Sequence, residues 1–94
     1  MDIEAARKEL EQLIVEHGAL THLSVKKYGK SLIVRSDTSQ GQQKHARLTY
    51  LGRAQWGLSF PLHTGRWEQS PFAGSLPELW ETLTTNFAFY LEYN

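Results

Sequence analysis

Residues 21–69 consist of short runs in which apolar and polar residues alternate, separated by turns that contain glycine. Successive side chains of a strand point to opposite faces of a sheet, so this alternation is typical of strands that cover a core on one face. The pattern predicts one antiparallel sheet of four or five strands connected as a meander. Residues 36–44 are polar throughout, and we expect a loop there. We also expect Pro71 to end the last strand.

The first hairpin is expected to turn at residues 28 and 29, because this register collects four apolar side chains on one face. The expected pairs are Val25 with Leu32 and Leu23 with Val34. The second hairpin is expected to have a three-residue turn at residues 52–54, since a two-residue turn would mix polar and apolar residues on each face. The pairs that follow are Leu48 with Leu58, Tyr50 with Trp56, and Ala46 with Phe60.

Amphipathic helices are expected on both sides of the sheet segment. Residues 2–17 carry apolar residues at three- and four-residue spacing, with Asp2 as the N-cap and Gly18 as the stop. A second helix is expected to begin at Ser75, which precedes Glu78 by three residues as in a capping box. The sequence therefore predicts an α+β two-layer sandwich formed by residues 1–94 as a single domain, with both helices on the apolar face of the sheet.

Charge is strongly segregated although the formal net charge is zero. Residues 1–18 carry a balance of −3, residues 19–66 a balance of +7, and residues 67–94 a balance of −4. The helices are thus acidic and the sheet is basic. A basic stripe beside an acidic layer attracts phosphate-rich partners, but the same pattern is typical of an ordinary solvated sheet face.

From this charge map we predict a small non-enzymatic binding module whose sheet face and hairpin tips contact an anionic partner, either nucleic acid or an acidic protein. The candidate anion-binding residues are Lys26, Lys27, Lys30, Arg35, Arg47 and Arg53. Proteins that bind single-stranded nucleic acid place aromatic residues on the open sheet face. The alternation instead places three aromatic residues on the face that covers the core, namely Tyr50, Trp56 and Phe60. This leaves Tyr28 and Trp67 as the candidates for stacking.

Histidines gather at the opposite end of the expected sheet. His22, His45 and His63 lie there with Arg35 and Asp37, and could ligate zinc or support acid-base chemistry. Their spacing matches no metal motif, so a polar rim is the competing interpretation. The chain has no cysteine, no serine in a glycine elbow and no phosphate-binding glycine loop. We therefore expect no enzyme activity, no bound metal and no cofactor.

The chain contains no apolar run long enough to cross a membrane, and the absence of cysteine suits a reducing compartment, so a cytoplasmic location without membrane contact is expected. The C-terminal residues are unusually aromatic, and one helical face cannot hide them all. An exposed aromatic patch usually marks an interface, so the alternative function is self-association as a homodimer. The interface residues expected for it are Phe87, Phe89, Tyr90, Leu91 and Tyr93.

Overall fold

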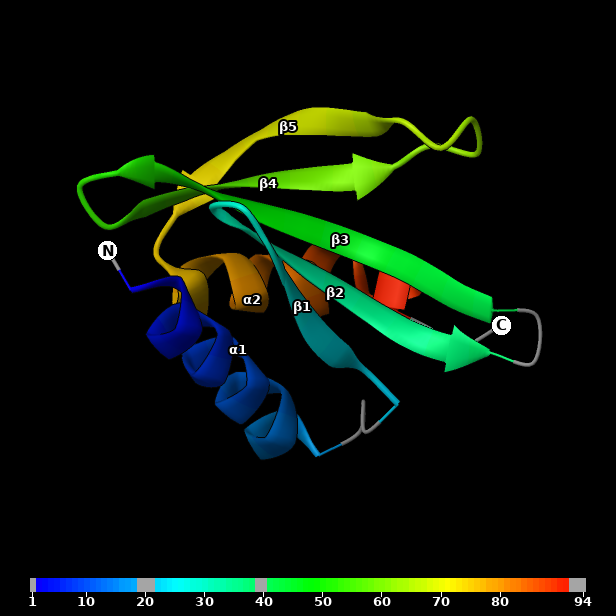
Figure 1. Cartoon of the computed structure of the whole chain (residues 1–94), viewed down its shortest axis with the longest axis horizontal. Coiled ribbons are helices and arrows are strands. Elements are labelled where there is room, and N and C mark those ends of the chain that lie inside the picture. The colour runs from blue at the N-terminus through cyan, green and yellow to red at the C-terminus, as the bar shows by residue number, and fades with distance from the viewer. Residues whose placement is uncertain (1, 19–21, 39–40, 92–94) are drawn as a thin grey trace.

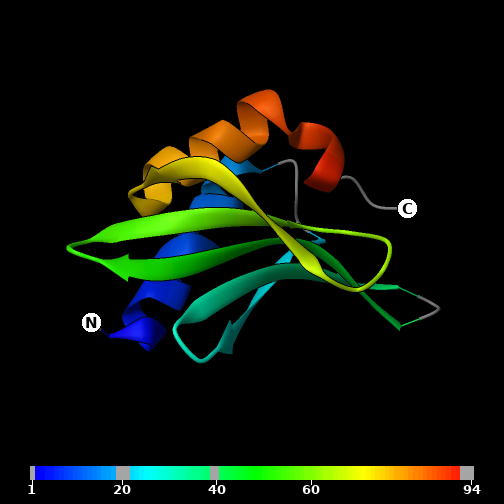
Figure 2. The same cartoon turned by 90° about the horizontal axis from the view of Figure 1, so that it is seen from above.

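The computed structural model, which describes residues 2–18, 22–38 and 41–91, is an α+β fold with a five-stranded antiparallel sheet (Figure 1). The strands follow the meander order β1-β2-β3-β4-β5, and helices α1 and α2 pack on one face of the sheet (Figure 2). This is the predicted architecture. The elements are α1 (Ile3–His17), β1 (Ser24–Tyr28), β2 (Ser31–Thr38), β3 (Gly41–Gly52), β4 (Gln55–Pro61), β5 (Trp67–Gly74), α2 (Leu76–Asn86) and a 3-10 turn η1 (Ala88–Leu91).

The predicted helix ends are confirmed. The Asp2 side chain accepts hydrogen bonds from the backbone N–H groups of Glu4 and Ala5, at 3.0 and 3.3 Å. Helix α1 ends at Gly18, which has φ +80°. At the start of α2 the Ser75 hydroxyl accepts from the Glu78 N–H, while the Glu78 carboxylate accepts from the Ser75 N–H. These local signals suffice because a cap satisfies backbone groups within one turn of itself.

One apolar core lies between the helices and the sheet. Its fully buried side chains include Leu10 of α1, Leu32, Val34, Leu48 and Leu58 of the sheet, and Leu83 of α2. The predicted burial of Trp56 and Phe60 is confirmed, and Tyr50 is partly buried edge-on to Trp56 at 5.2 Å. No helix in the described ranges is long and apolar enough to cross a bilayer.

The predicted register of the first hairpin is wrong, although the assignment of its faces is right. The turn residues are Gly29 and Lys30, so Val25 pairs with Val34 and Tyr28 with Ser31. Two-residue hairpin turns need a positive φ at their first central position. Gly29 supplies φ +60° there, whereas the predicted turn would have placed Tyr28 in that strained position.

The predicted pairing of the second hairpin is confirmed at Leu48 with Leu58 and at Tyr50 with Trp56, but the turn is tighter than predicted. Gly52 pairs with Gln55, which leaves two turn residues, Arg53 and Ala54, with φ +53° and +59°. The register shifts between Tyr50 and Gly52, and this bulge takes up the extra residue. The ladder starts with Arg47 opposite Ser59, so the expected pair of Ala46 with Phe60 lies beyond it.

Two expectations about strand ends are also wrong. Residues 36–44 are not a loop, because β2 continues to Thr38 and β3 starts at Gly41, while residues 39 and 40 lie outside the described ranges. Backbone ladder bonds need no apolar side chains, so a polar hairpin end can extend the sheet. Pro71 does not end β5 either. Pro71 lies on an edge strand, at a register shift between β4 and β5, so the N–H group that proline lacks is not needed for the backbone hydrogen bonds of the ladder. Next to it, the Ser70 hydroxyl donates a hydrogen bond to the Leu58 carbonyl at 2.7 Å.

The C-terminal segment folds back onto its own core. Phe87 ends α2 and packs against Phe60 and Phe72, with ring centroids 4.9 and 5.4 Å apart. Leu91 is 0% exposed, and its carbonyl accepts a hydrogen bond from His22 Nε2 at 2.8 Å. Leu91 therefore has no surface to offer a second chain. The side chains of Phe89 and Tyr90, and all of Tyr93, lie outside what the structure describes.

Candidate anion-binding site on the open sheet face

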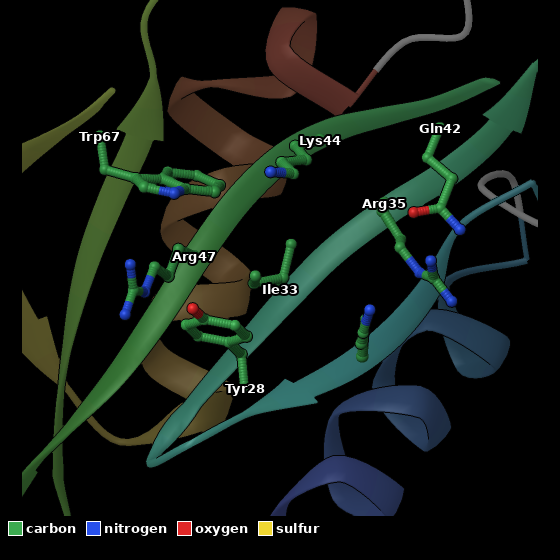
Figure 3. A pocket seen from close by; sticks show the side chains of 8 residues that line it. Tyr28, Ile33, Arg35, Gln42, Lys44, Arg47 and Trp67 are labelled. Carbon is green, nitrogen blue, oxygen red and sulfur yellow. The ribbon is translucent and has the colours of Figure 1, made fainter. Parts of the chain in front are cut away.

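The sheet face that the helices leave open carries a hollow of about 350 Å³ (Figure 3). Four strands contribute to it, and it contains four cationic side chains without a carboxylate. The lining residues are Lys26 and Tyr28 of β1, Ile33 and Arg35 of β2, Gln42, Lys44 and Arg47 of β3, and Trp67 of β5.

A β-bulge in β3 aims Lys44 at this hollow. The register between β2 and β3 shifts after Val34, which pairs with Ala46, so that Arg35 pairs with Lys44 and His45 is the extra residue. His45 is 1% exposed and its Nε2 lies 2.8 Å from the Ser36 hydroxyl. Lys44 and Arg47 are three residues apart and would point to opposite faces of a regular strand. The bulge places both on the open face, because an inserted residue re-aims the side chains beyond it.

Cations face each other across the strands of the hollow. Arg35 lies directly opposite Lys44 on the neighbouring strand. In the next open-face row, Ile33 lies between Lys26 on β1 and Arg47 on β3. Like charges opposite each other on adjacent strands destabilise a sheet. A bound anion would remove this repulsion.

Arg47, in the lining of the hollow, is held in place by neutral partners. Its Nε donates to the Ser31 hydroxyl at 3.0 Å, and that hydroxyl lies 3.0 Å from the hydroxyl of Thr49. Its guanidinium carbon lies 5.7 Å from the ring centroid of Tyr28 and 5.9 Å from that of Trp67, and Figure 3 shows the three side chains next to one another. Both distances are within the range of cation–π contacts. The guanidinium is thus oriented without being neutralised.

No cation of the hollow has an ion-pair partner among residues 2–18, 22–38 and 41–91. The ion pairs found there lie on the helical side, where Glu4 binds Arg7 and Lys27, and Arg7 also binds Glu11. Arg35 Nε is buried and has no hydrogen-bond partner within the described chain.

The six predicted anion-binding residues are distributed over three places. Lys26, Arg35 and Arg47 line the hollow, as do the two stacking candidates Tyr28 and Trp67. Lys27 lies on the helical side, 2.8 Å from Glu4. Lys30 and Arg53 are exposed at the turns and do not line the hollow. The sequence analysis missed Gln42 and Lys44. The one signal in the sequence was Lys44 itself, a charged residue at a position where the alternation of β3 predicts a side chain that faces the core.

The predicted histidine group is brought together only in part. The rings of His22 and His45 lie 6.0 Å apart, and each contributes Nε2 to one of the contacts given above. His63 and Asp37 are exposed, His63 in the turn between β4 and β5. Within the described ranges, no three histidine or acidic side chains are grouped so that they could hold a metal ion.

The lining of the hollow offers cationic donors, one amide and two aromatic faces, and it contains no carboxylate, imidazole or thiol. No protein-family model matches this chain, and no curated protein or solved structure is significantly similar to it, so its function has to be inferred from its own residues.

Proposed function

We propose that this protein is a non-enzymatic binding module whose open sheet face binds an anionic partner, and that the partner is nucleic acid. The observation that carries the proposal is the hollow in which Arg35 faces Lys44, and Lys26 and Arg47 lie in the neighbouring row, with no carboxylate in the lining. Such an arrangement is unfavourable in the free protein and becomes favourable when phosphates lie between the cations.

The charge distribution of the whole molecule supports the same face. The acidic side chains of α1 and α2 lie in the helical layer, and the cations of the hollow lie on the opposite side of the sheet. A polyanion is therefore repelled by one layer and attracted by the other, which orients its approach although the net charge is zero.

Aromatic residues favour nucleic acid over an acidic protein. Tyr28 and Trp67 border the same hollow as the cations, and Tyr28 is 62% exposed. An acidic protein needs only positive charge and donors, whereas nucleic acid also offers base faces that stack on aromatic rings.

The test compares two double variants that lose the same charge. Lys44→Gln with Arg47→Gln removes two cations from the hollow, and Lys30→Gln with Arg53→Gln removes two from the hairpin tips. Binding to a labelled oligonucleotide is measured by fluorescence anisotropy over a range of salt concentrations. We expect the hollow variant to bind more weakly. The slope of log binding constant against log salt concentration, here called the salt slope, should become shallower by about 1.4, the value for two lost phosphate contacts on a single strand.

The hairpin-tip variant should bind nearly as the unmodified protein does, because its two side chains do not line the hollow. Equal losses in both variants would mean that only overall charge matters and would contradict a site in the hollow. No salt-dependent binding by the unmodified protein would contradict nucleic acid as the partner and would favour an acidic protein.

Self-association as a homodimer is the second candidate function. It is favoured by the edge strand β5, where Phe72 is 37% exposed next to Phe87 at the end of α2. Sedimentation velocity over a range of protein concentrations tests it. We expect a dimer that dissociates when Phe72 is replaced by Asp, and a monomer at high concentration would exclude this candidate.

A further inference from the structure

The open face has features that distinguish between forms of nucleic acid, and the inference drawn from them rests on the proposed function. We propose that the ligand is single-stranded, that it crosses the open face from β1 towards β5, and that its bases stack on Tyr28 and Trp67 on either side of Arg47. The cations Lys26, Arg35, Lys44 and Arg47 then contact its phosphates.

The two aromatic rings are placed to receive bases. Each ring centroid lies within 6 Å of the Arg47 guanidinium carbon, so the separation of the rings cannot exceed the sum of those two distances. Trp67 is partly exposed, whereas Trp56 and Trp80 are 5% and 6% exposed in the core. Base faces are free to stack in a single strand but are covered by their neighbours in a duplex. Exposed rings between cations therefore favour an unpaired strand.

A second hollow continues the surface beyond Arg47 and Trp67, which line both hollows. Its volume is about 270 Å³, and its remaining lining consists of Thr49, Leu51, Gly57, Ser59 and Gln69. Apart from Arg47 these groups are neutral, and their hydroxyls and amide suit the polar edges of bases. Together the two hollows extend from β1 to β5. A single nucleotide would leave much of this surface empty, so a polymer fits it better.

The bulge that follows Tyr50 shapes the second hollow. Leu51 lies outside the β3–β4 ladder and is 54% exposed, and its side chain covers Gly57, where a Cβ atom would come within 3.3 Å of it. This leucine gives the neutral hollow an apolar patch that water contacts in the free protein. A base that covered it would remove apolar surface from water, which is favourable.

The experiment uses four probes, of which the first two carry the same number of phosphates. They are a labelled oligothymidylate of about 15 nucleotides, an abasic strand of the same length, the corresponding duplex, and thymidine monophosphate. We expect the oligothymidylate to bind most tightly and to quench the fluorescence of Trp67. The abasic strand keeps the phosphates and loses the bases, so the difference between these two strands measures stacking.

Trp67→Leu and Tyr28→Leu should each weaken oligothymidylate binding roughly 5- to 150-fold, the effect of removing one stacked base, while the salt slope stays unchanged. Trp67→Leu should also abolish the quenching. Phe72→Leu is the matched control, because it removes an exposed aromatic ring that does not line either hollow. Circular dichroism of each variant establishes that it is folded.

Equal affinity for the abasic strand, or tighter binding of the duplex, would overturn the stacking inference and leave the proposed function standing. Thymidine monophosphate binding as tightly as the oligothymidylate would overturn the assignment of a polymer. If no probe bound, the proposed function itself would be wrong.

Discussion

Leu91 gives the sharpest test of how the C-terminal segment is used. It belongs to a short 3-10 turn, yet it is 0% exposed within the core cluster of the sheet and both helices. Replacing it with Ala removes buried methyl and methylene groups and leaves a cavity. Such replacements cost about 3–5 kcal/mol at rigid core sites. We expect about 3 kcal/mol here, because a turn near the end of the described chain can partly collapse into the space.

A loss of this size is large for a chain of 94 residues. Domains of this length have total stabilities of roughly 5–14 kcal/mol, so Leu91→Ala would remove between a fifth and more than half of it. Urea unfolding followed by circular dichroism measures the effect. With a slope of about 1.5 kcal/mol per molar urea, the midpoint should fall by about 2 M.

Leu62→Ala is the matched control, since the same atoms are removed from a side chain that is 40% exposed in the turn after β4. Its effect should stay within about 0.5 kcal/mol. If the two variants were equally stable, the burial of Leu91 in its own chain would be refuted. A loss that grew or shrank with protein concentration would show that Leu91 packs between two chains.

Two further predictions concern local structure. Ala54 has φ +59°, a conformation that costs a residue with a Cβ atom about 1 kcal/mol, so Ala54→Gly should raise the thermal midpoint, and a lower midpoint would contradict the strained turn. The N–H and hydroxyl of Ser75 hold the pKa of the Glu78 carboxyl below its usual value. Its contribution to stability is therefore present above the unfolded-state pKa and is lost as the pH falls through the lower folded-state pKa. On acidification the urea midpoint of the Glu78→Gln variant should therefore fall less than that of the Glu81→Gln variant. If the two midpoints depended on pH in the same way, this role of Glu78 would be contradicted.

Local sequence signals decided the helices and the faces of the strands. Asp2, Gly18 and the pair Ser75 with Glu78 act within one helical turn, so their neighbours along the chain are enough to predict them. The alternation of apolar residues likewise assigned Leu48 and Trp56 to the core and Arg47 of β3 to the open face. A period of two residues does not depend on the rest of the fold.

Positions where this period breaks could be found only in the tertiary structure. The bulge places His45 in a buried contact with Ser36, nine residues away, and it decides that Lys44 joins Arg35 and Arg47. Nothing in the neighbouring residues of β3 signals that contact. The candidate site therefore could be predicted as a charged face, but not as the arrangement of cations that forms the hollow.

The destination of the C-terminal segment was also decided by the tertiary structure. Its aromatic composition predicted a need for burial, but composition does not say whether the covering surface belongs to the same chain. Phe87 and Leu91 contact Phe60 and His22, residues that are distant in the sequence. Whether such contacts form depends on the space that the sheet and α2 leave open, which is a property of the packed layers and not of any segment alone.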